Sequence, residues 1–234
     1  MKLSVIVPVY NEVGTLAEVI RRIRAAPVMV PMELILVDDC SVDGTREFLQ
    51  SLDSSIKAES GELKVLMHER NLGKGAAIRT AIPHATGTII LIQDADLEYD
   101  PQDYGALLKP IFDGHADVVF GNRFHGGAHR VLYFWHAVGN RCLTTLCNMV
   151  TKLNLTDMEV GYKVFRSEIL KQLQLHSSRF GFEPEITVKV AKLGCRIYEV
   201  PISYHGRTYA EGKKISWRDG IAALFHIIRF RFFD

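Results

Sequence analysis

The chain has 234 residues, of which 47% are hydrophobic and 24% charged, and its formal net charge is +1. This composition is typical of a folded protein, and the near-neutral charge does not indicate a nucleic-acid partner. The four cysteines form no CxxC pair and no zinc-finger spacing, which favours free thiols in a reducing compartment. No apolar run approaches the roughly 20 residues that a transmembrane helix needs. We therefore expect one domain, residues 1–234, that does not cross a membrane.

The first half of the chain alternates short apolar runs with segments of helical periodicity. Buried strands are predicted at residues 3–9, 34–37, 63–67, 88–93 and 117–120. Helices are predicted at residues 15–25, after a cap at Asp43, and at 75–82. Continuous apolar strands that alternate with helices predict an α/β fold with a mainly parallel sheet, covered by helices on both faces.

The second half is less regular. Its predicted elements, in chain order, are a helix at 131–151, a strand at 159–165, a helix at 183–193, a strand at 196–200, a polar and basic loop at 203–214, and an apolar helix at 217–232. No repeat, low-complexity segment or linker separates the two halves. We therefore keep both halves in the same domain.

Two carboxylates stand one residue apart at the end of a predicted strand, in Asp94-Ala95-Asp96. Such a pair can hold Mn²⁺ or Mg²⁺, and the cation can in turn bridge a diphosphate. An EF-hand is excluded, because Tyr99 stands at the turn glycine and Gly105 at the final glutamate. The alternative is a solvated acidic turn, although the carboxyl ends of parallel strands are where ligands bind.

A second candidate site is Gly73-Lys74-Gly75, which precedes a predicted helix. Glycines allow close backbone approach there, and Lys74 can meet a phosphate at the helix N-terminus. The third glycine of the dinucleotide fingerprint is missing, and the segment follows the third strand rather than the first. The spacing of a P-loop is missing as well. A nicotinamide dehydrogenase is therefore not favoured.

Four motifs together resemble one enzyme family. They are Ser4-Val5-Ile6-Val7-Pro8-Val9-Tyr10-Asn11-Glu12, Asp38-Asp39-Cys40-Ser41, Asn71-Leu72-Gly73-Lys74-Gly75 and Asp94-Ala95-Asp96-Leu97. In this order they resemble the signature of glycosyltransferase family 2, and within it the dolichyl-phosphate mannose synthase group. The resemblance extends through Gly121-Asn122-Arg123, the segment 156–163 and the segment 200–214. It implies a GT-A fold, which is a Rossmann-like nucleotide-binding α/β domain with an Asp-x-Asp metal site.

The resemblance also implies roles for individual residues. The donor nucleotide-sugar would be bound by Pro8, Tyr10, Glu12, Asp38, Asp39, Lys74, Asp94 and Ala95. The metal would be held by Asp94, Asp96 and Glu98. The acceptor phosphate would be bound by Arg123, Arg141, Thr145, Arg207 and Lys213. Asp96, Asp157 and Arg123 are the expected catalytic residues; Asp157 either orients a sugar hydroxyl or acts as a base.

The chain departs from the family pattern at three places. Glu98 stands where many members have Gln, and Glu159-Val160 replaces the usual Thr-Ser. Residues 211–214 replace Gly-Glu-Ser-Lys with Glu-Gly-Lys-Lys. These changes concern the identity of the substrates more than the type of reaction.

The expected reaction is inverting transfer of a hexose from GDP-mannose or UDP-glucose to a polyprenyl or dolichyl phosphate. Residues 1–122 would bind the donor, and residues 123–234 would bind the acceptor and face the membrane. The alternative is a family 2 enzyme with a water-soluble glycan acceptor, for which Glu159, Glu183 or Glu185 would serve as the base. Choosing between the two donors requires more than the sequence.

The C-terminal segment predicts how the protein meets a membrane. Its apolar residues recur at helical spacing and are Ile221, Leu224, Phe225, Ile228 and Phe232. With Trp217 and Arg229 at its edges, such a helix can lie in a bilayer interface. We therefore expect peripheral association with the cytoplasmic face of a membrane. The alternatives are packing on its own domain, on a second copy, or on a separate membrane subunit.

Overall fold

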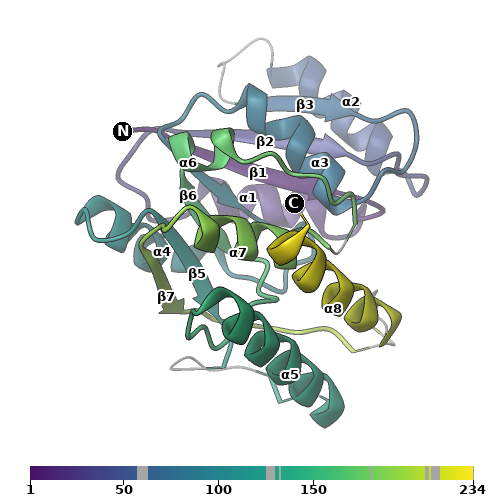
Figure 1. The fold of residues 1–234 in the computed structure, drawn as a ribbon. Coiled ribbons are helices and arrows are strands. Elements are labelled where there is room, and N and C mark those ends of the chain that lie inside the picture. The colour runs from purple at the N-terminus through teal and green to yellow at the C-terminus, as the bar shows by residue number, and fades with distance from the viewer. Residues whose placement is uncertain are drawn as a thin grey trace.

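A seven-stranded sheet forms the centre of the structure, a computed structural model that describes residues 1–56, 63–124, 130–131, 133–179, 181–208, 211 and 217–233. The strands lie in the order β3-β2-β1-β4-β6-β5-β7 (Figure 1). The strands are β1 Leu3–Val9, β2 Met32–Asp38, β3 Leu63–Met67, β4 Ile89–Ile92, β5 Val118–Asn122, β6 Lys163–Arg166 and β7 Ile197–Pro201. The helices are α1 Leu16–Arg24, α2 Thr45–Ile56, α3 Lys74–Ala81, α4 Tyr104–Phe112, α5 Phe134–Thr151, α6 Ser167–Gln172, α7 Phe182–Lys192 and α8 Trp217–Phe232.

The central strands are apolar on both faces, which explains the helical cover on both sides. β1 has the sequence LSVIVPV, with a single residue that is not fully buried. It pairs in parallel with β2 and β4, so that Val5 lies opposite Leu34 on one side and Leu91 on the other. Helices α3, α6 and α7 lie in front of the sheet in Figure 1, and α1, α2 and α4 lie behind it. This arrangement confirms the predicted mainly parallel α/β sheet.

Strand β6 runs antiparallel to both of its neighbours, β4 and β5. The segment before it crosses the carboxyl edge of the sheet, where Gly161 lies so close to Asp94 that a Cβ would be 2.3 Å from Asp94 Oδ2. Because the chain enters β6 from that edge, the strand runs back in the opposite direction. Residues 157–161 are thereby held over the ends of the parallel strands.

Helices α5 and α8 lie below the sheet in Figure 1 and pack against α7. Their contact is a small apolar cluster separate from the main core. It consists of Cys147, Met158, Val188, Ile227 and Phe230. In the described part of the chain, no helix combines the length and the hydropathy that a membrane span requires.

The predicted elements of the first half are confirmed to within two residues at each end. In the second half, the long helix begins at Phe134 instead of residue 131, and the strand predicted at 159–165 is shorter, Lys163–Arg166. Helices α4 and α6 were not predicted. Helix α4 contains Gly105 and Pro110, which disfavour a helix in isolation, while its buried residues Leu107, Leu108 and Ile111 stabilise it in the fold.

Candidate active site

The turns after three central strands carry unusual backbone conformations. Asn11 after β1, Cys40 after β2 and Leu97 after β4 have φ values of 53°, 64° and 62°. A left-handed conformation is unfavourable for residues other than glycine, and such strain is concentrated at functional sites. The three turns lie at the carboxyl ends of adjacent parallel strands. This edge is therefore the candidate active site.

The two aspartates of the Asp-x-Asp motif each have a cationic partner. Lys74 Nζ lies 2.8 Å from Asp94 Oδ1, and Arg207 Nη2 lies 3.0 Å from Asp96 Oδ2. Lys74 also lies 2.9 Å from Glu183 Oε1 on α7. Burial lowers the pKa of Lys74, but the charges of Asp94 and Glu183 outweigh it and hold that pKa well above its usual value. Lys74 is therefore a cation held against the aspartate pair.

The guanidinium of Arg207 lies among three carboxylates from different loops. Besides Asp96, it has Glu12 at 3.6 Å and Glu98 at 3.5 Å. Glu98 also accepts hydrogen bonds from the Arg207 backbone N–H at 2.8 Å and from the Tyr204 hydroxyl at 2.9 Å. The basic loop after β7 is thus tied to the turns that follow β1 and β4. Glu98 faces this loop.

The chemistry of the aspartate pair fits a divalent cation. Burial, together with the negative charges of Asp94 and Glu98, raises the pKa of Asp96 to about 7. Carboxylate oxygens confined in this way are the ligands that Mg²⁺ and Mn²⁺ prefer. Among the residues that the structure describes, no three His, Cys, Asp or Glu side chains are arranged as a ready metal site. Of the three predicted metal ligands, Asp94 and Asp96 are the two that would hold a cation, while Glu98 accepts hydrogen bonds from Arg207 and Tyr204.

A second ion pair joins the residue after β5 to the segment that precedes β6. Arg123, after β5, donates from Nε and Nη2 to the two carboxylate oxygens of Asp157, both at 2.7 Å. Asp157 is fully buried, and Asn140 from α5 also donates to it at 3.3 Å. The Arg123 guanidinium lies 5.2 Å from the centre of the Tyr204 ring. Because Tyr204 bonds to Glu98, Arg123 is connected to the Asp96–Arg207 pair.

The other predicted acceptor-binding residues lie elsewhere. Arg141 and Thr145 are exposed on α5, and the Thr145 hydroxyl donates to the Arg141 carbonyl within the helix. The inward face of α5 instead presents Asn140 and Thr144, which bond to Asp157 and to the Met158 backbone. Lys213 lies outside the described residues. The structure therefore brings together Arg123 and Arg207, and it does not bring Arg141 or Thr145 into contact with them.

The predicted donor-binding aspartates after β2 hold neighbouring loops in place. Asp39 accepts the backbone N–H groups of Leu72 and Gly73 at 2.8 and 2.7 Å, and it bonds to His68 at 2.8 Å. Asp38 is fully buried and accepts the Ser41 N–H at 3.1 Å. These contacts fix the positions of the loops that follow β2 and β3.

The remaining predicted donor contacts lie along β1 and β4. Tyr10 is 38% exposed at the end of β1, and Pro8 is partly buried within it. Glu12 is buried and accepts the Thr15 hydroxyl at 2.8 Å. The same hydroxyl also lies 2.8 Å from the carbonyl of Ala95, so that its single proton is shared between the two acceptors. The turns after β1 and β4 are therefore joined directly.

Several residues of the site were not predicted. Glu199 on β7 accepts the N–H groups of Thr156 and Asp157 at 2.9 and 3.1 Å, which orients Asp157. Tyr99 and Tyr162 stack with ring centres 4.6 Å apart beneath the site, and the Tyr99 hydroxyl accepts the Gly161 N–H at 2.8 Å. Pairs between segments this far apart leave no periodic signal in a single sequence.

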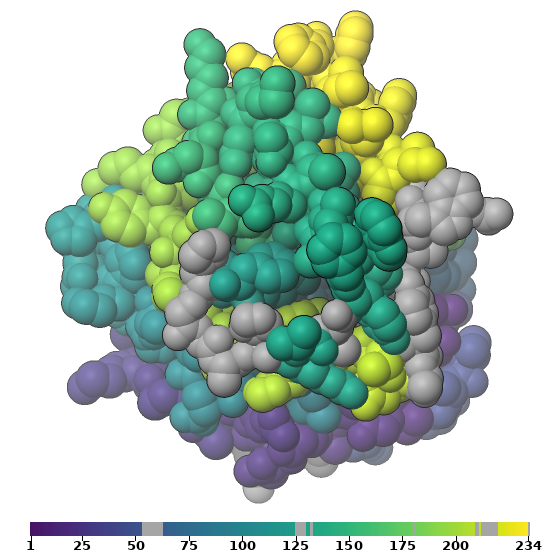
Figure 2. Space-filling model, turned by 90° about the horizontal axis from the view of Figure 1, so that it is seen from below, coloured from purple at the N-terminus to yellow at the C-terminus, as the bar shows by residue number. Residues whose placement is uncertain are grey.

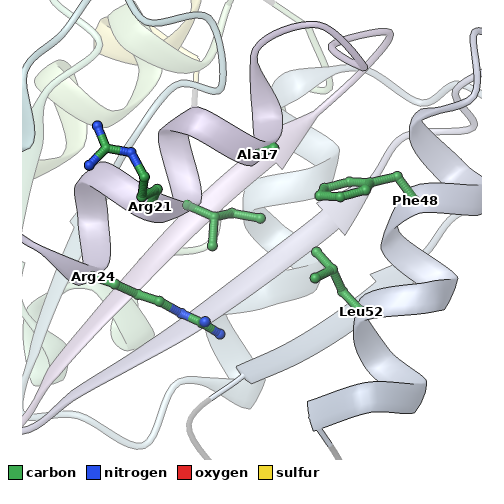
Figure 3. Close-up of a pocket in the computed structure, with 6 residues that line it drawn as sticks. Ala17, Arg21, Arg24, Phe48 and Leu52 are labelled. Carbon is green, nitrogen blue, oxygen red and sulfur yellow. The ribbon is translucent and has the colours of Figure 1, made fainter.

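An apolar pocket of about 240 Å³ lies away from this edge, between α1 and α2. Phe48 and Leu52 from α2 face Ala17 and the Arg24 stem from α1, and the Arg21 head points away (Figure 3). Its lining holds no carboxylate. It is therefore not the polar site described above.

Comparison with known proteins agrees with the geometry. The family profile "Glycosyl transferase family 2" matches residues 4–174. The chain belongs to glycosyl transferase family 2. The predicted family is thereby confirmed.

Two bacterial relatives share 30% identity with the chain. Dodecaprenyl-phosphate galacturonate synthase of Rhizobium johnstonii aligns over 97% of this chain and 64% of its own length. Undecaprenyl-phosphate mannosyltransferase of Micrococcus luteus aligns over 91% of this chain and 87% of its own length. The archaeal glycosyltransferase AglJ of Haloferax volcanii is also 30% identical, over 87% of this chain and 63% of its own length. The chain thus spans less than two thirds of the Rhizobium and Haloferax relatives.

Solved structures confirm the GT-A fold. Glucosyl-3-phosphoglycerate synthase of Mycobacterium tuberculosis, in complex with Mn²⁺, UDP and phosphoglyceric acid, superposes with a TM-score of 0.74 at 19% identity. The superposition covers 100% of this chain and 79% of that protein. A second complex of the same enzyme, with Mg²⁺ and UDP, gives a TM-score of 0.72 at 20% identity.

Proposed function

We propose that the protein transfers one hexose from a nucleotide-sugar, GDP-mannose or UDP-glucose, to a polyprenyl or dolichyl phosphate, with inversion at the anomeric carbon. The observation that carries this proposal is the connected cluster of Asp96, Arg207, Glu98, Tyr204 and Arg123. In this proposal its arginines would bind the acceptor phosphate, and its carboxylates would meet the donor diphosphate through a divalent cation. The polyprenyl-phosphate names of the Rhizobium and Micrococcus relatives support the same acceptor.

The donor end lies in residues 1–122. Asp94 and Asp96 would hold Mn²⁺ or Mg²⁺, which supplies positive charge against the leaving nucleoside diphosphate. The complexes of the mycobacterial enzyme with UDP and either cation support this choice. Lys74, already held at Asp94, adds a second positive charge next to the diphosphate. Tyr10, exposed at the end of β1, is positioned to contact the base or ribose.

The acceptor end lies in residues 123–234. Arg123 and Arg207 would bind the acceptor phosphate through the guanidinium N–H groups that do not face Asp157 and Asp96, because a guanidinium carries five N–H donors. A phosphate oxygen attacks the anomeric carbon, and a new C–O bond forms there. The bond from that carbon to the diphosphate breaks, and its electron pair leaves with the nucleoside diphosphate. The attacking oxygen is already ionised at neutral pH, so the step requires no general base.

Asp157 has a supporting part in this scheme. Its carboxylate is fully buried and occupied by both nitrogens of the Arg123 fork. Of the two roles that the sequence leaves open, this geometry favours orientation over proton transfer, since Asp157 sets the direction of Arg123. Glu199 in turn holds the backbone of Asp157.

The lipid chain of the acceptor requires a nearby apolar surface, and α5 and α8 present one. Phe134 and Trp135 at the start of α5 are 69% and 76% exposed. Exposed residues of α8 and the residue after it are Ile221, Leu224, Phe225, Ile228, Phe232 and Phe233. Figure 2 shows side chains of α5, in green, and of α8, in yellow, on one face of the molecule. This face would lie on the cytoplasmic surface of a membrane, with α8 in the interface.

A transfer assay tests the proposal. Purified protein is incubated with Mn²⁺, a polyprenyl phosphate and labelled GDP-mannose or UDP-glucose, and label is counted in the organic phase. We expect label from one donor, and its loss in Asp96→Asn. Asp113→Asn is the matched control, because Asp113 pairs with Lys109 on the surface of α4. Label in water-soluble glycan instead of lipid would establish the alternative, a soluble acceptor.

A further inference from the structure

The carboxylate of Glu199, on the edge strand β7, is bonded to the turn that carries Asp157. Its Oε1 accepts the backbone N–H groups of Thr156 and Asp157 at 2.9 and 3.1 Å, and its Oε2 accepts the Thr156 hydroxyl at 2.9 Å. A carboxylate only accepts hydrogen bonds, so it fixes the directions in which these two N–H groups and the hydroxyl point. Glu199 therefore sets the orientation of the turn at residues 156 and 157.

One chain of hydrogen bonds leads from this turn to the side chain of Arg123. The Asp157 carboxylate accepts hydrogen bonds from Nε and Nη2 of Arg123, both at 2.7 Å. Because a guanidinium is planar and rigid, these two bonds also fix the direction of the third nitrogen, Nη1. The Asp157 side chain starts from the backbone that Glu199 holds, so a rotation of this turn would turn the guanidinium with it.

A second chain of hydrogen bonds leads from the same carboxylate to the backbone of Arg123. The Thr156 hydroxyl donates to Glu199 and accepts a hydrogen bond from Nδ2 of Asn122. The Oδ1 of the same asparagine accepts the backbone N–H of Phe124 at 2.9 Å, which closes the turn that contains Arg123. The two chains thus begin at one carboxylate and converge on one arginine.

The place of Glu199 in the fold suits control of geometry more than support of the core. Strand β7 pairs in parallel with β5, so that Glu199 lies beside the strand that ends directly before Arg123. Glu199 is partly exposed. Water can therefore satisfy the N–H groups of residues 156 and 157 if the carboxylate is removed, and such bonds are nearly as favourable as direct ones. Loss of Glu199 should cost little in folding, but it would release the turn.

The direction of Arg123 matters because this arginine is one of the two assigned above to the acceptor phosphate. We propose that Glu199 is a positioning residue for the acceptor phosphate, which it serves by holding Arg123 through Asp157 and through the Thr156 hydroxyl. This inference rests on the proposed function. Its effect is confined to the acceptor, because the groups assigned to the donor are held by other pairs, Lys74 with Asp94 and Glu183, and Asp96 with Arg207.

The test compares Glu199→Ala with Glu199→Gln. Titration calorimetry measures the affinity for geranyl phosphate, a short and water-soluble acceptor, and separately for UDP or GDP with Mn²⁺. Glu199→Ala should weaken geranyl phosphate binding by roughly tenfold or more, since misplacement of about 1 Å in a site costs on the order of 10²-fold. The KM for the acceptor should rise in parallel, and nucleotide affinity should stay unchanged, which also shows that the variant is folded.

Glu199→Gln should recover most of the lost affinity. A single amide oxygen in the place of Oε1 can accept both backbone N–H groups, as Oε1 does now. Tyr198→Ala is the matched control on β7, because Tyr198 is 45% exposed and neighbouring residues of a strand point to opposite faces. It should alter neither affinity.

The variant Arg123→Lys provides a second measurement. Lysine keeps the positive charge but lacks the planar fork, so Glu199→Ala should have a smaller effect on geranyl phosphate affinity in this background than in the wild type. Equal losses in both backgrounds, or an equal loss of nucleotide affinity, would overturn the proposal. Unchanged geranyl phosphate binding by Glu199→Ala would refute this inference alone. Failure of the wild type to bind geranyl phosphate, while it binds UDP or GDP, would refute the proposed function and the inference with it.

Discussion

The ion pair between Arg123 and Asp157 is bidentate, and its carboxylate is completely buried. The Arg123 fork donates to both Asp157 oxygens at 2.7 Å, and the arginine itself is 13% exposed. A buried pair of this kind contributes little relative to an apolar pair, but the loss of one partner leaves an uncompensated charge. We therefore expect changes at Arg123 and at Asp157 to have strongly non-additive effects on the free energy of unfolding.

We predict that Arg123→Ala lowers the free energy of unfolding by about 3 to 5 kcal/mol, because Asp157 is left buried and unpaired. The double variant Arg123→Ala/Asp157→Ala should be more stable than the sum of the two single changes implies. Urea denaturation of the four proteins in a double-mutant cycle measures the coupling. Additive effects of the two single changes would show that Arg123 is not the main partner of Asp157.

At the residue scale, local spacing is visible in the sequence and long-range contacts are not. Asp94 and Asp96 were identified because adjacent carboxylates at a strand end have a recognisable spacing, and both face cations at the predicted edge. Glu199 was missed, because its bonds to residues 156 and 157 cross more than 40 positions of the chain. A single sequence encodes local spacing and does not encode such long-range pairs.

At the scale of elements, the segment before β6 determines how close the second half lies to the Asp94–Asp96 edge of the sheet. Gly161 has no side chain, and so its backbone lies directly against Asp94 and the Tyr99 ring. The sequence predicted a strand across 159–165, whereas the ladder begins only at Lys163. The apolar pattern there reflects burial of Val160 and Tyr162 in the core, not pairing between strands.

We predict that Gly161→Ala weakens binding of Mn²⁺ with UDP or GDP by tenfold or more. A Cβ at this position would lie 2.3 Å from Asp94 Oδ2 and 3.0 Å from the Tyr99 ring, and misplacement of about 1 Å in a site costs on the order of 10²-fold. Titration calorimetry measures the affinity. Gly139→Ala in α5, where a Cβ meets nothing within 4 Å, should leave binding unchanged and stabilise the fold by about 0.5 to 1 kcal/mol. Equal affinities for the two variants would contradict the close approach.

At the scale of the molecule, one helix connects the proposed donor site to the proposed membrane face. Helix α7 presents Glu183 to Lys74 at its first turn, and Val188 joins the apolar cluster of α5 and α8. His226 of α8 also packs against Gly181, where a Cβ would lie 2.5 Å from the ring. The apolar periodicity predicted α8 correctly, but its packing on α7 and α5 required the tertiary structure.

The exposed face of α5 and α8 therefore leads to the last prediction. Replacing Trp135 and Phe225 by serine should reduce binding to vesicles of phosphatidylcholine and phosphatidylglycerol by roughly tenfold or more, because each large apolar side chain contributes about 1.5 to 3 kcal/mol when it is removed from water. Transfer to a polyprenyl phosphate in vesicles should fall in parallel. Transfer to a short, water-soluble prenyl phosphate should be retained, because both residues are exposed and lie outside the ion-pair cluster. Met29→Ser is the matched control, since Met29 is fully exposed in the loop before β2. Unchanged flotation of the double variant would exclude this face as the membrane contact, and a loss of self-association in sedimentation would assign it to a second copy of the chain.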